Sequence, residues 1–82
     1  MNKTLHVLLI EDNEDDAQLI VRELRAAKYD VKFQRVDTPE NMNIALEAQP
    51  WDIIFCDYTM PQFKGTDALY LAQSKNLDIP FI

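Results

Sequence analysis

The stretch that decides the fold reads Ile53-Ile54-Phe55-Cys56-Asp57-Tyr58-Thr59-Met60-Pro61. Its apolar part is short, is rich in β-branched and aromatic residues, and ends at a carboxylate. Such a run predicts a strand buried on both faces, as in a parallel sheet that helices cover. Pro61 and Gly65 indicate a loop behind it. Ligands of open α/β sheets bind beyond the carboxyl ends of the strands, which makes Asp57 a candidate site residue.

A second apolar run, Val7-Leu8-Leu9-Ile10, also ends at acidic residues, Glu11 and Asp12. If the two strands are neighbours, three carboxylates come together, and they repel one another unless a cation is present. Hard oxygen ligands with no histidine or cysteine in the set favour Mg²⁺ or a similar ion over zinc. The sequence therefore predicts a divalent-cation pocket with one carboxylate left for another task.

Composition limits the other possibilities. The chain has 82 residues, 48% of them hydrophobic, which predicts one small domain with a real core. A net charge of −6 argues against direct nucleic-acid binding. The single cysteine, Cys56, excludes an internal disulfide and is expected to be a small buried hydrophobe. We find no signal-peptide pattern and no apolar run of transmembrane length, so we expect a cytoplasmic protein without a membrane partner.

Hydrophobic periodicity predicts alternating strands and helices. Strands are expected at residues 5–10, 31–36, 53–56 and 79–82, the second of them at an edge of the sheet. Helices are expected from 14 to about 28, from 39 to just before Pro50, and from 66 to about 74, with Asn13 and Thr38 as N-caps of the first two. Residues 76–78 are expected to form a turn. This β-α-β-α-β-α-β order predicts a parallel sheet with right-handed crossovers, the α/β class.

Apolar residues at helical spacing predict the core contacts of each helix. Trp51 is expected to be a partly buried anchor at the entry to the third strand. The predicted core contacts are Ala17, Ile20, Val21, Leu24 and Ala27 in the first helix, Met42, Ala45 and Leu46 in the second, and Leu69, Leu71 and Ala72 in the third.

Three motifs in this order give the chain a strong resemblance to a known family. They are Val7-Leu8-Leu9-Ile10-Glu11-Asp12-Asn13, the strand end Ile54-Phe55-Cys56-Asp57, and Met60-Pro61-Gln62-Phe63-Lys64-Gly65. Together they resemble the receiver domain of two-component response regulators over the whole chain. The resemblance implies a flavodoxin-like, doubly wound fold with strand order 2-1-3-4-5, which places the first and third strands side by side.

The resemblance also implies roles for individual residues. Asp57 matches the phosphoacceptor aspartate, and Glu11 and Asp12 match the acidic pair that binds Mg²⁺, Asp12 being the expected direct ligand. Thr59 matches the position whose backbone carbonyl completes the metal site and whose side chain faces the pocket and tunes dephosphorylation. The loop positions of the family correspond to Met60, Pro61 and Gly65, where the glycine is expected to permit the backbone geometry.

The chain departs from the family pattern in three ways. Glu11 replaces the commoner aspartate, and Lys64 stands where an acid often precedes the glycine. The family's switch Ser/Thr and its phosphate-contacting lysine correspond to positions beyond Ile82. Residues 1–82 are therefore expected to form a partial receiver domain that lacks the segment after strand four, and to self-associate through the apolar surface that this exposes.

The function implied is that of a phosphoacceptor module that receives a phosphoryl group on Asp57 from a histidine kinase or phosphotransfer protein, with Mg²⁺, and switches a downstream output. It is not expected to be an enzyme beyond this self-catalysed transfer and dephosphorylation. The combination of Tyr29-Asp30-Val31, Arg35-Val36-Asp37-Thr38 and the stretch 57–63 resembles receivers that begin larger signalling proteins with sensor, kinase or cyclic-dinucleotide output domains, and a stand-alone receiver is the alternative.

Two other functions remain open from the sequence. One is a receiver-like binding module that works without phosphorylation. The other is a Mg²⁺-dependent α/β phosphatase or phosphotransferase, although such enzymes place an Asp-x-Asp pair at the first strand, where this chain has Glu11-Asp12-Asn13. Asp57 on its own could simply cap the next turn. The acids at 14–16 are expected to be solvated residues of the first helical turn.

Overall fold

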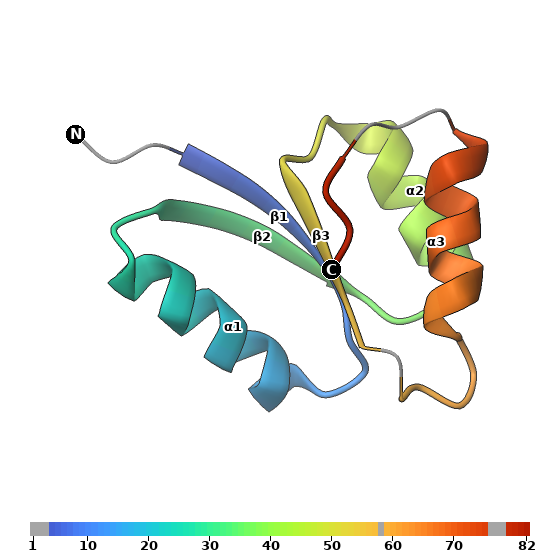
Figure 1. Ribbon diagram of the computed structural model, residues 1–82, viewed down its shortest axis with the longest axis horizontal. Helices are drawn as coiled ribbons and strands as arrows, with labels where there is room; N and C mark the ends of the chain where they lie inside the picture. The colour runs from blue at the N-terminus through green and yellow to red at the C-terminus, as the bar shows by residue number, and fades with distance from the viewer. Residues whose placement is uncertain (1–3, 58, 76–78) are drawn as a thin grey trace.

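The computed structural model describes residues 4–57, 59–75 and 79–82. Three strands alternate with three helices along the chain (Figure 1). In order, these elements are β1 (Thr4–Ile10), α1 (Glu14–Ala26), β2 (Asp30–Val36), α2 (Pro39–Ala48), β3 (Ile53–Cys56) and α3 (Gly65–Ser74). The α/β class and the order of these six elements are as predicted. Among the described residues, no helix combines the length and the hydropathy needed to cross a membrane.

The strands form a parallel sheet in the order β2-β1-β3, with α1 on one face and α2 and α3 on the other (Figure 1). β1 pairs with β2 from Thr4↔Asp30 to Ile10↔Val36, and with β3 from Val7↔Ile53 to Ile10↔Cys56. β1 is thus the central strand, and β2 lies at the edge, as expected. The register makes β1 and β3 end at the same level, and this positions the site.

Each face of the sheet has its own hydrophobic core. The core under α1 consists of Val7, Leu9, Ala17, Val21 and Val31. On the opposite face, α2 and α3 cover a larger core that includes Leu8, Ile10, Met42, Ala45, Leu46, Ile54, Phe63, Ala68 and Ala72. Successive residues of β1 point into alternate cores because side chains alternate along a strand. This explains why the run from Val7 to Ile10 is wholly apolar and has no solvent-exposed member.

The expected burial of β3 on both faces was wrong in part. Ile54 is fully buried, but Ile53, Phe55 and Cys56 are half-buried. Ile53 and Phe55 lie on the α1 face, where α1 packs chiefly against β2 and leaves β3 only partly covered, whereas Cys56 packs against the core on the opposite face. Trp51 differs in the other direction. It is buried, and its indole Nε1 donates a hydrogen bond to the carbonyl of Ala45 at 2.8 Å.

The fourth expected strand begins beside β3. Phe81 forms a parallel bridge with Ile54, and the N–H of Ile54 bonds the carbonyl of Pro80 at 2.9 Å. Ile82 donates to the carbonyl of Ile54 at 2.9 Å and accepts from the N–H of Cys56 at 2.7 Å. The pairing has the predicted direction and place, although it amounts to a single bridge. Tyr58 and the turn expected at 76–78 lie outside the described residues.

α1 ends two residues before the expected boundary. Its last residue is Ala26, and Ala27 is an exposed C-cap instead of a core contact. Lys28 has a φ of 75°, and its N–H bonds the carbonyl of Arg25, while the N–H of Tyr29 bonds that of Leu24. This is a Schellman motif, which usually has glycine in the left-handed position. Sequence analysis did not locate this helix end because a lysine occupies the position where glycine is usual.

α3 also differs in detail from the prediction. It begins at Gly65, one residue early, and its buried positions include Ala68, while Leu69 is only half-buried. Gly65 is buried, and no glycine of the described chain has a positive φ. The loop therefore does not use this glycine for a positive φ, and the observed feature is its burial at the start of α3. The predicted caps Asn13 and Thr38 are both confirmed.

Candidate functional site

The register of the sheet brings the candidate residues together. Ile10 and Cys56 are the last paired residues of β1 and β3, and the hydrogen bonds continue one step beyond them. The N–H of Asp57 donates to the carbonyl of Ile10 at 2.9 Å, and the N–H of Glu11 donates to that of Val36 at 3.0 Å. Glu11 and Asp57 are therefore neighbours at the carboxyl edge of the sheet. By strand alternation both lie on the α1 side.

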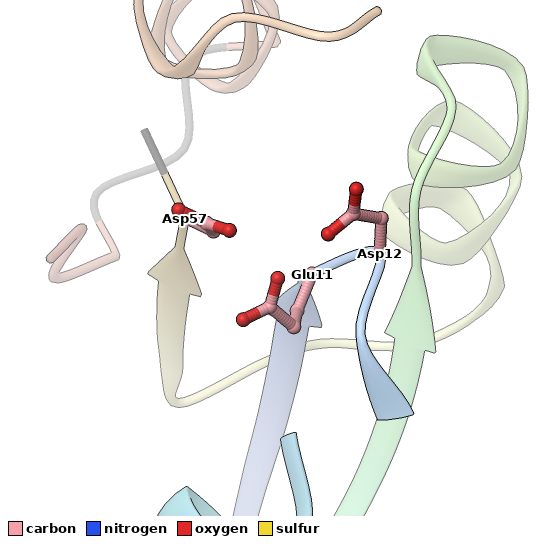
Figure 2. Close-up of side chains that lie close together, drawn as sticks. All are labelled: Glu11, Asp12 and Asp57. Atoms are coloured by element: carbon pink, nitrogen blue, oxygen red, sulfur yellow. The ribbon is translucent and has the colours of Figure 1, made fainter. Parts of the chain in front are cut away.

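Three carboxylates converge at this edge. One oxygen each of Glu11, Asp12 and Asp57 lies within 4.8 Å of the others. Figure 2 shows Glu11 at the end of β1, Asp12 in the loop that follows β1, and Asp57 at the end of β3, with their side chains pointing into a common space. Glu11 is buried, with only 7% of its surface exposed, whereas Asp12 is exposed and Asp57 is half-buried. The cluster is thus anchored in the protein on one side and open to solvent on the other.

Thr59 holds the Asp57 carboxylate. Its backbone N–H and its hydroxyl both donate to Oδ1 of Asp57, at 2.8 and 2.6 Å. These bonds favour the charged carboxylate, so they are the main reason that the pKa of Asp57 lies below its ordinary value of 3.8. Asp57 is consequently ionised, and one of its oxygens is fixed in place.

The pKa of Glu11 is shifted in the opposite direction. Burial, followed by a hydrogen bond with Asp57, raises the pKa of Glu11 from 4.5 to about 7. The same bond contributes to the lowered pKa of Asp57, so the shared proton resides on Glu11. Near neutral pH this proton relieves part of the repulsion among the carboxylates. A bound cation would do the same and would displace the proton.

Cys56 is the other candidate nucleophile at this edge. Burial is the largest cause that raises the pKa of its thiol to about 11, and the nearby charges of Asp57 and Glu11 add to it. The thiol donates to the carbonyl of Asp57 at 3.6 Å. It stays protonated at neutral pH, and a protonated thiol is a poor nucleophile. The carboxylate of Asp57 is therefore the group suited to attack.

The donor set fits a hard divalent cation. The converging atoms are carboxylate oxygens, which Mg²⁺ prefers, and the open side of the cluster leaves room for the water ligands that Mg²⁺ usually keeps. A pocket of about 460 Å³ adjoins the cluster. The sequence analysis missed two of its wall residues, Asp16 and Ile20. Their four-residue spacing on α1 could have predicted a shared face.

The loop after Asp57 contains both buried and exposed residues. Met60 and Phe63 are buried in the core under α2 and α3, which ties the loop to the sheet. Pro61 is exposed, and Gly65 is buried at the start of α3. Of the predicted site residues, the structure thus brings together Glu11, Asp12, Asp57 and Thr59, while Met60 and Gly65 support the loop from inside the fold.

Comparison with known proteins agrees with this geometry. Residues 7–82 match the family described as "Response regulator receiver domain". The chain is also 32% identical, over all of its 82 residues, to the protein named "Transcription factor SKN7" of Saccharomyces cerevisiae, of which it spans 13%. No solved structure matched the chain. The sheet order observed is the 2-1-3 part of the flavodoxin-like order. The chain belongs to the response regulator receiver domain family of two-component signalling.

Proposed function

We propose that this domain accepts a phosphoryl group on Asp57 from a histidine kinase or a phosphotransfer protein. The observation that carries the proposal is the convergence of Glu11, Asp12 and Asp57 within 4.8 Å at the end of two neighbouring strands. Membership of the receiver family supports the same role. Among the three acids, Asp57 is the one that Thr59 fixes in the ionised form.

The transfer uses the carboxylate as nucleophile. A free oxygen of Asp57 forms a bond to phosphorus, and the bond between phosphorus and the donor's nitrogen or oxygen breaks with its electron pair. The donor's leaving group takes up a proton, and the product on the domain is an acyl phosphate. Thr59 orients the attacking carboxylate, since both of its donors bond Oδ1. Asp57 also needs a partner that offsets the charge of the incoming phosphoryl oxygens.

Glu11, Asp12, Asp57 and the backbone carbonyl of Thr59 are the groups that would hold Mg²⁺. When bound, Mg²⁺ neutralises charge on the transferring oxygens. Glu11 must lose its proton to take part, because a protonated carboxyl is a weak ligand. The longer side chain of Glu11 starts from the buried end of β1, so it reaches the cluster without extending into solvent.

The test is intact-mass analysis after incubation with MgCl₂ and acetyl phosphate. We expect one phosphoryl adduct on the protein and none on Asp57→Asn. Asp52→Asn is the matched control, because Asp52 precedes the same strand at its other end and should leave the adduct unchanged. A folded, Mg²⁺-binding protein that forms no adduct would instead support the second candidate, a binding module that works without phosphorylation.

The phosphoryl group would switch an output in the parent protein. The yeast relative is named a transcription factor, and the chain spans only 13% of it, so transcriptional control is one output class to consider. Sensor, kinase and cyclic-dinucleotide domains are the others. Phosphorylation of Asp57 would be read through the surface next to the pocket, where Thr59 and Asp16 lie beside the phosphoacceptor.

A further inference from the structure

Arg35 contacts the candidate site from the edge strand, and neither the sequence motifs nor the proposed function assigns it a role. It lies at the carboxyl end of β2, one residue before the strand ends at Val36. Its guanidinium Nη1 donates to the backbone carbonyl of Glu11 at 3.2 Å. The same nitrogen lies 3.9 Å from a carboxylate oxygen of Asp37. Its side chain is one-third exposed, so the bond is partly shielded from water.

This contact is the second hydrogen bond between β2 and the main chain of Glu11. The N–H of Glu11 bonds the carbonyl of Val36 at 3.0 Å, which is the last bond of the parallel ladder. Beyond Val36 the chain leaves the sheet toward Thr38, the N-cap of α2. The ladder therefore offers no further backbone donor for the carbonyl of Glu11, and the guanidinium of Arg35 takes that place. Both polar groups of the Glu11 main chain are thus bound to β2.

The position of this peptide matters because two of the three converging acids depend on it. The carbonyl of Glu11 belongs to the peptide group that joins Glu11 to Asp12. The side chains on either side of this peptide meet Asp57 within 4.8 Å. If the peptide rotated, Glu11 and Asp12 would both change direction. Asp12 is exposed, so packing around it does little to fix its direction.

We propose that Arg35 is a positioning residue for the cation site: it fixes the Glu11–Asp12 peptide and so directs both carboxylates toward Asp57. This inference rests on the proposed Mg²⁺ site. Arg35 acts through the main chain, since its described contacts are the Glu11 carbonyl and Asp37 rather than a carboxylate of the cluster. Residues outside the ligand set that orient the ligands commonly change metal affinity by about 10-fold or more.

The sign of the effect separates positioning from simple electrostatics. Arg35 carries a positive charge close to a site for a cation. If charge alone mattered, Arg35→Gln would tighten Mg²⁺ binding, because a repulsive charge is lost and Asp37 is left unpaired. If Arg35 positions the acids, the same substitution weakens binding. The double variant Arg35→Gln/Asp37→Asn removes one charge of each sign, so its net charge equals that of the protein and only the positioning effect remains.

The experiment is a calorimetric titration with MgCl₂ of the protein and its variants. We expect the Kd for Mg²⁺ to rise about tenfold in Arg35→Gln and in the double variant. The amide donor of Gln lies on a side chain two atoms shorter than that of Arg35, whereas Arg35→Lys keeps a charged donor on a longer side chain, so we expect Lys to recover part of the affinity. Arg25→Gln is the matched control, because Arg25 makes the same kind of bond, to the carbonyl of Val31 at 3.3 Å, at the far end of β2. That variant should bind Mg²⁺ like the protein.

A second readout uses acetyl phosphate. The Mg²⁺ concentration that gives half the maximal phosphorylation rate should rise in Arg35→Gln by the same factor, while the rate at saturating Mg²⁺ changes less than twofold. A merely structural role would lower the melting temperature of Arg35→Gln and Arg25→Gln alike without this shift. Unchanged or tighter Mg²⁺ binding by folded Arg35→Gln or by the folded double variant would overturn the inference. Absence of Mg²⁺ binding by the protein itself would instead overturn the proposed function.

Discussion

Acidic side chains are arranged differently at the two ends of the parallel sheet. At the amino end, each acid has a donor of its own: Asp52 accepts the N–H of His6 at 2.8 Å, and Asp30 accepts the hydroxyl of Thr4 at 3.2 Å. At the carboxyl end, Glu11, Asp12 and Asp57 face one another within 4.8 Å. The bonds at the amino end add stability to the fold, whereas the repulsion among the crowded carboxylates reduces it, and the bonds from Thr59 to Asp57 offset part of that repulsion.

This difference shows how the domain separates folding from chemistry. The cores fix the register of β1 and β3, and the register then forces the acids together at the carboxyl end. Functional sites commonly retain such unfavourable arrangements because the activity depends on them. The comparison of the two ends therefore makes predictions about stability as well as about binding.

The largest expected effect is a loss of stability as the pH rises in the absence of Mg²⁺. The folded protein keeps a proton on Glu11 up to a pKa of about 7, whereas the unfolded chain releases it near 4.5. The stabilisation is complete below pH 4.5 and is lost as the pH rises through 7. Since each pKa unit corresponds to about 1.4 kcal/mol, the free energy of unfolding should fall by at most about 3.5 kcal/mol. Urea unfolding across this range measures it.

Two controls belong to this experiment. Glu11→Gln cannot release a proton, so its stability should vary much less between pH 4.5 and 8. Saturating Mg²⁺ should remove the fall in the protein, because the ion stabilises the ionised carboxylates. Asp57 acts in a different window, since its pKa is lowered and its contribution is lost only as the pH falls below 3.8. A flat stability profile for the protein from pH 4.5 to 8 would contradict the assignment of the proton to Glu11.

At the amino end, removing an acid should lower the free energy of unfolding, and by a smaller amount. Asp52→Ala removes the acceptor of the His6 N–H and should lower the free energy of unfolding by about 1 kcal/mol. Asp52→Asn keeps an acceptor oxygen and should cost less. Neither change should alter the Kd for Mg²⁺, which calorimetry can check. A change in Mg²⁺ affinity would show that the two ends of the sheet are coupled.

Thr59 gives the next smaller effect. Thr59→Val removes the hydroxyl that donates to Oδ1 of Asp57 at 2.6 Å but keeps the backbone donor. The pKa of Asp57 should therefore rise toward its ordinary value, and the stability at pH 7 should fall by about 0.5–1 kcal/mol. Carboxyl NMR titration measures the first quantity. Thr66→Val, at an exposed position of α3, is the control and should leave the pKa of Asp57 unchanged.

Much of this fold was predictable because its signals are local. The apolar runs of β1 and β3 and the caps Asn13 and Thr38 each follow from a few adjacent residues. The convergence of Glu11, Asp12 and Asp57 was predictable as well, since parallel neighbouring strands present their carboxyl ends at one edge. Several independent signals in the sequence agree on each of these features.

The features that sequence analysis missed depend on contacts between distant segments. The bond from Arg35 to the Glu11 carbonyl requires the register of β2 on β1. The partial exposure of Phe55 depends on where α1 packs, and the burial of Trp51 depends on its place in the core that α2 and α3 cover. No local pattern encodes these contacts, so the residues concerned were assigned by type alone.

The smallest expected effect lies at the amino end, in the turn between α1 and β2. Lys28 occupies the left-handed position of the Schellman motif with a φ of 75°, which costs an L-amino acid about 1–2 kcal/mol. Lys28→Gly removes this cost but adds the extra chain entropy of glycine in the unfolded state, so we expect a net gain of about 0.5 kcal/mol. Ala27→Gly is the control. Ala27 has a φ of −82°, and glycine there should destabilise the protein. If thermal unfolding showed both variants to be destabilised alike, the strain at Lys28 would be absent, and the amino end would be relaxed throughout.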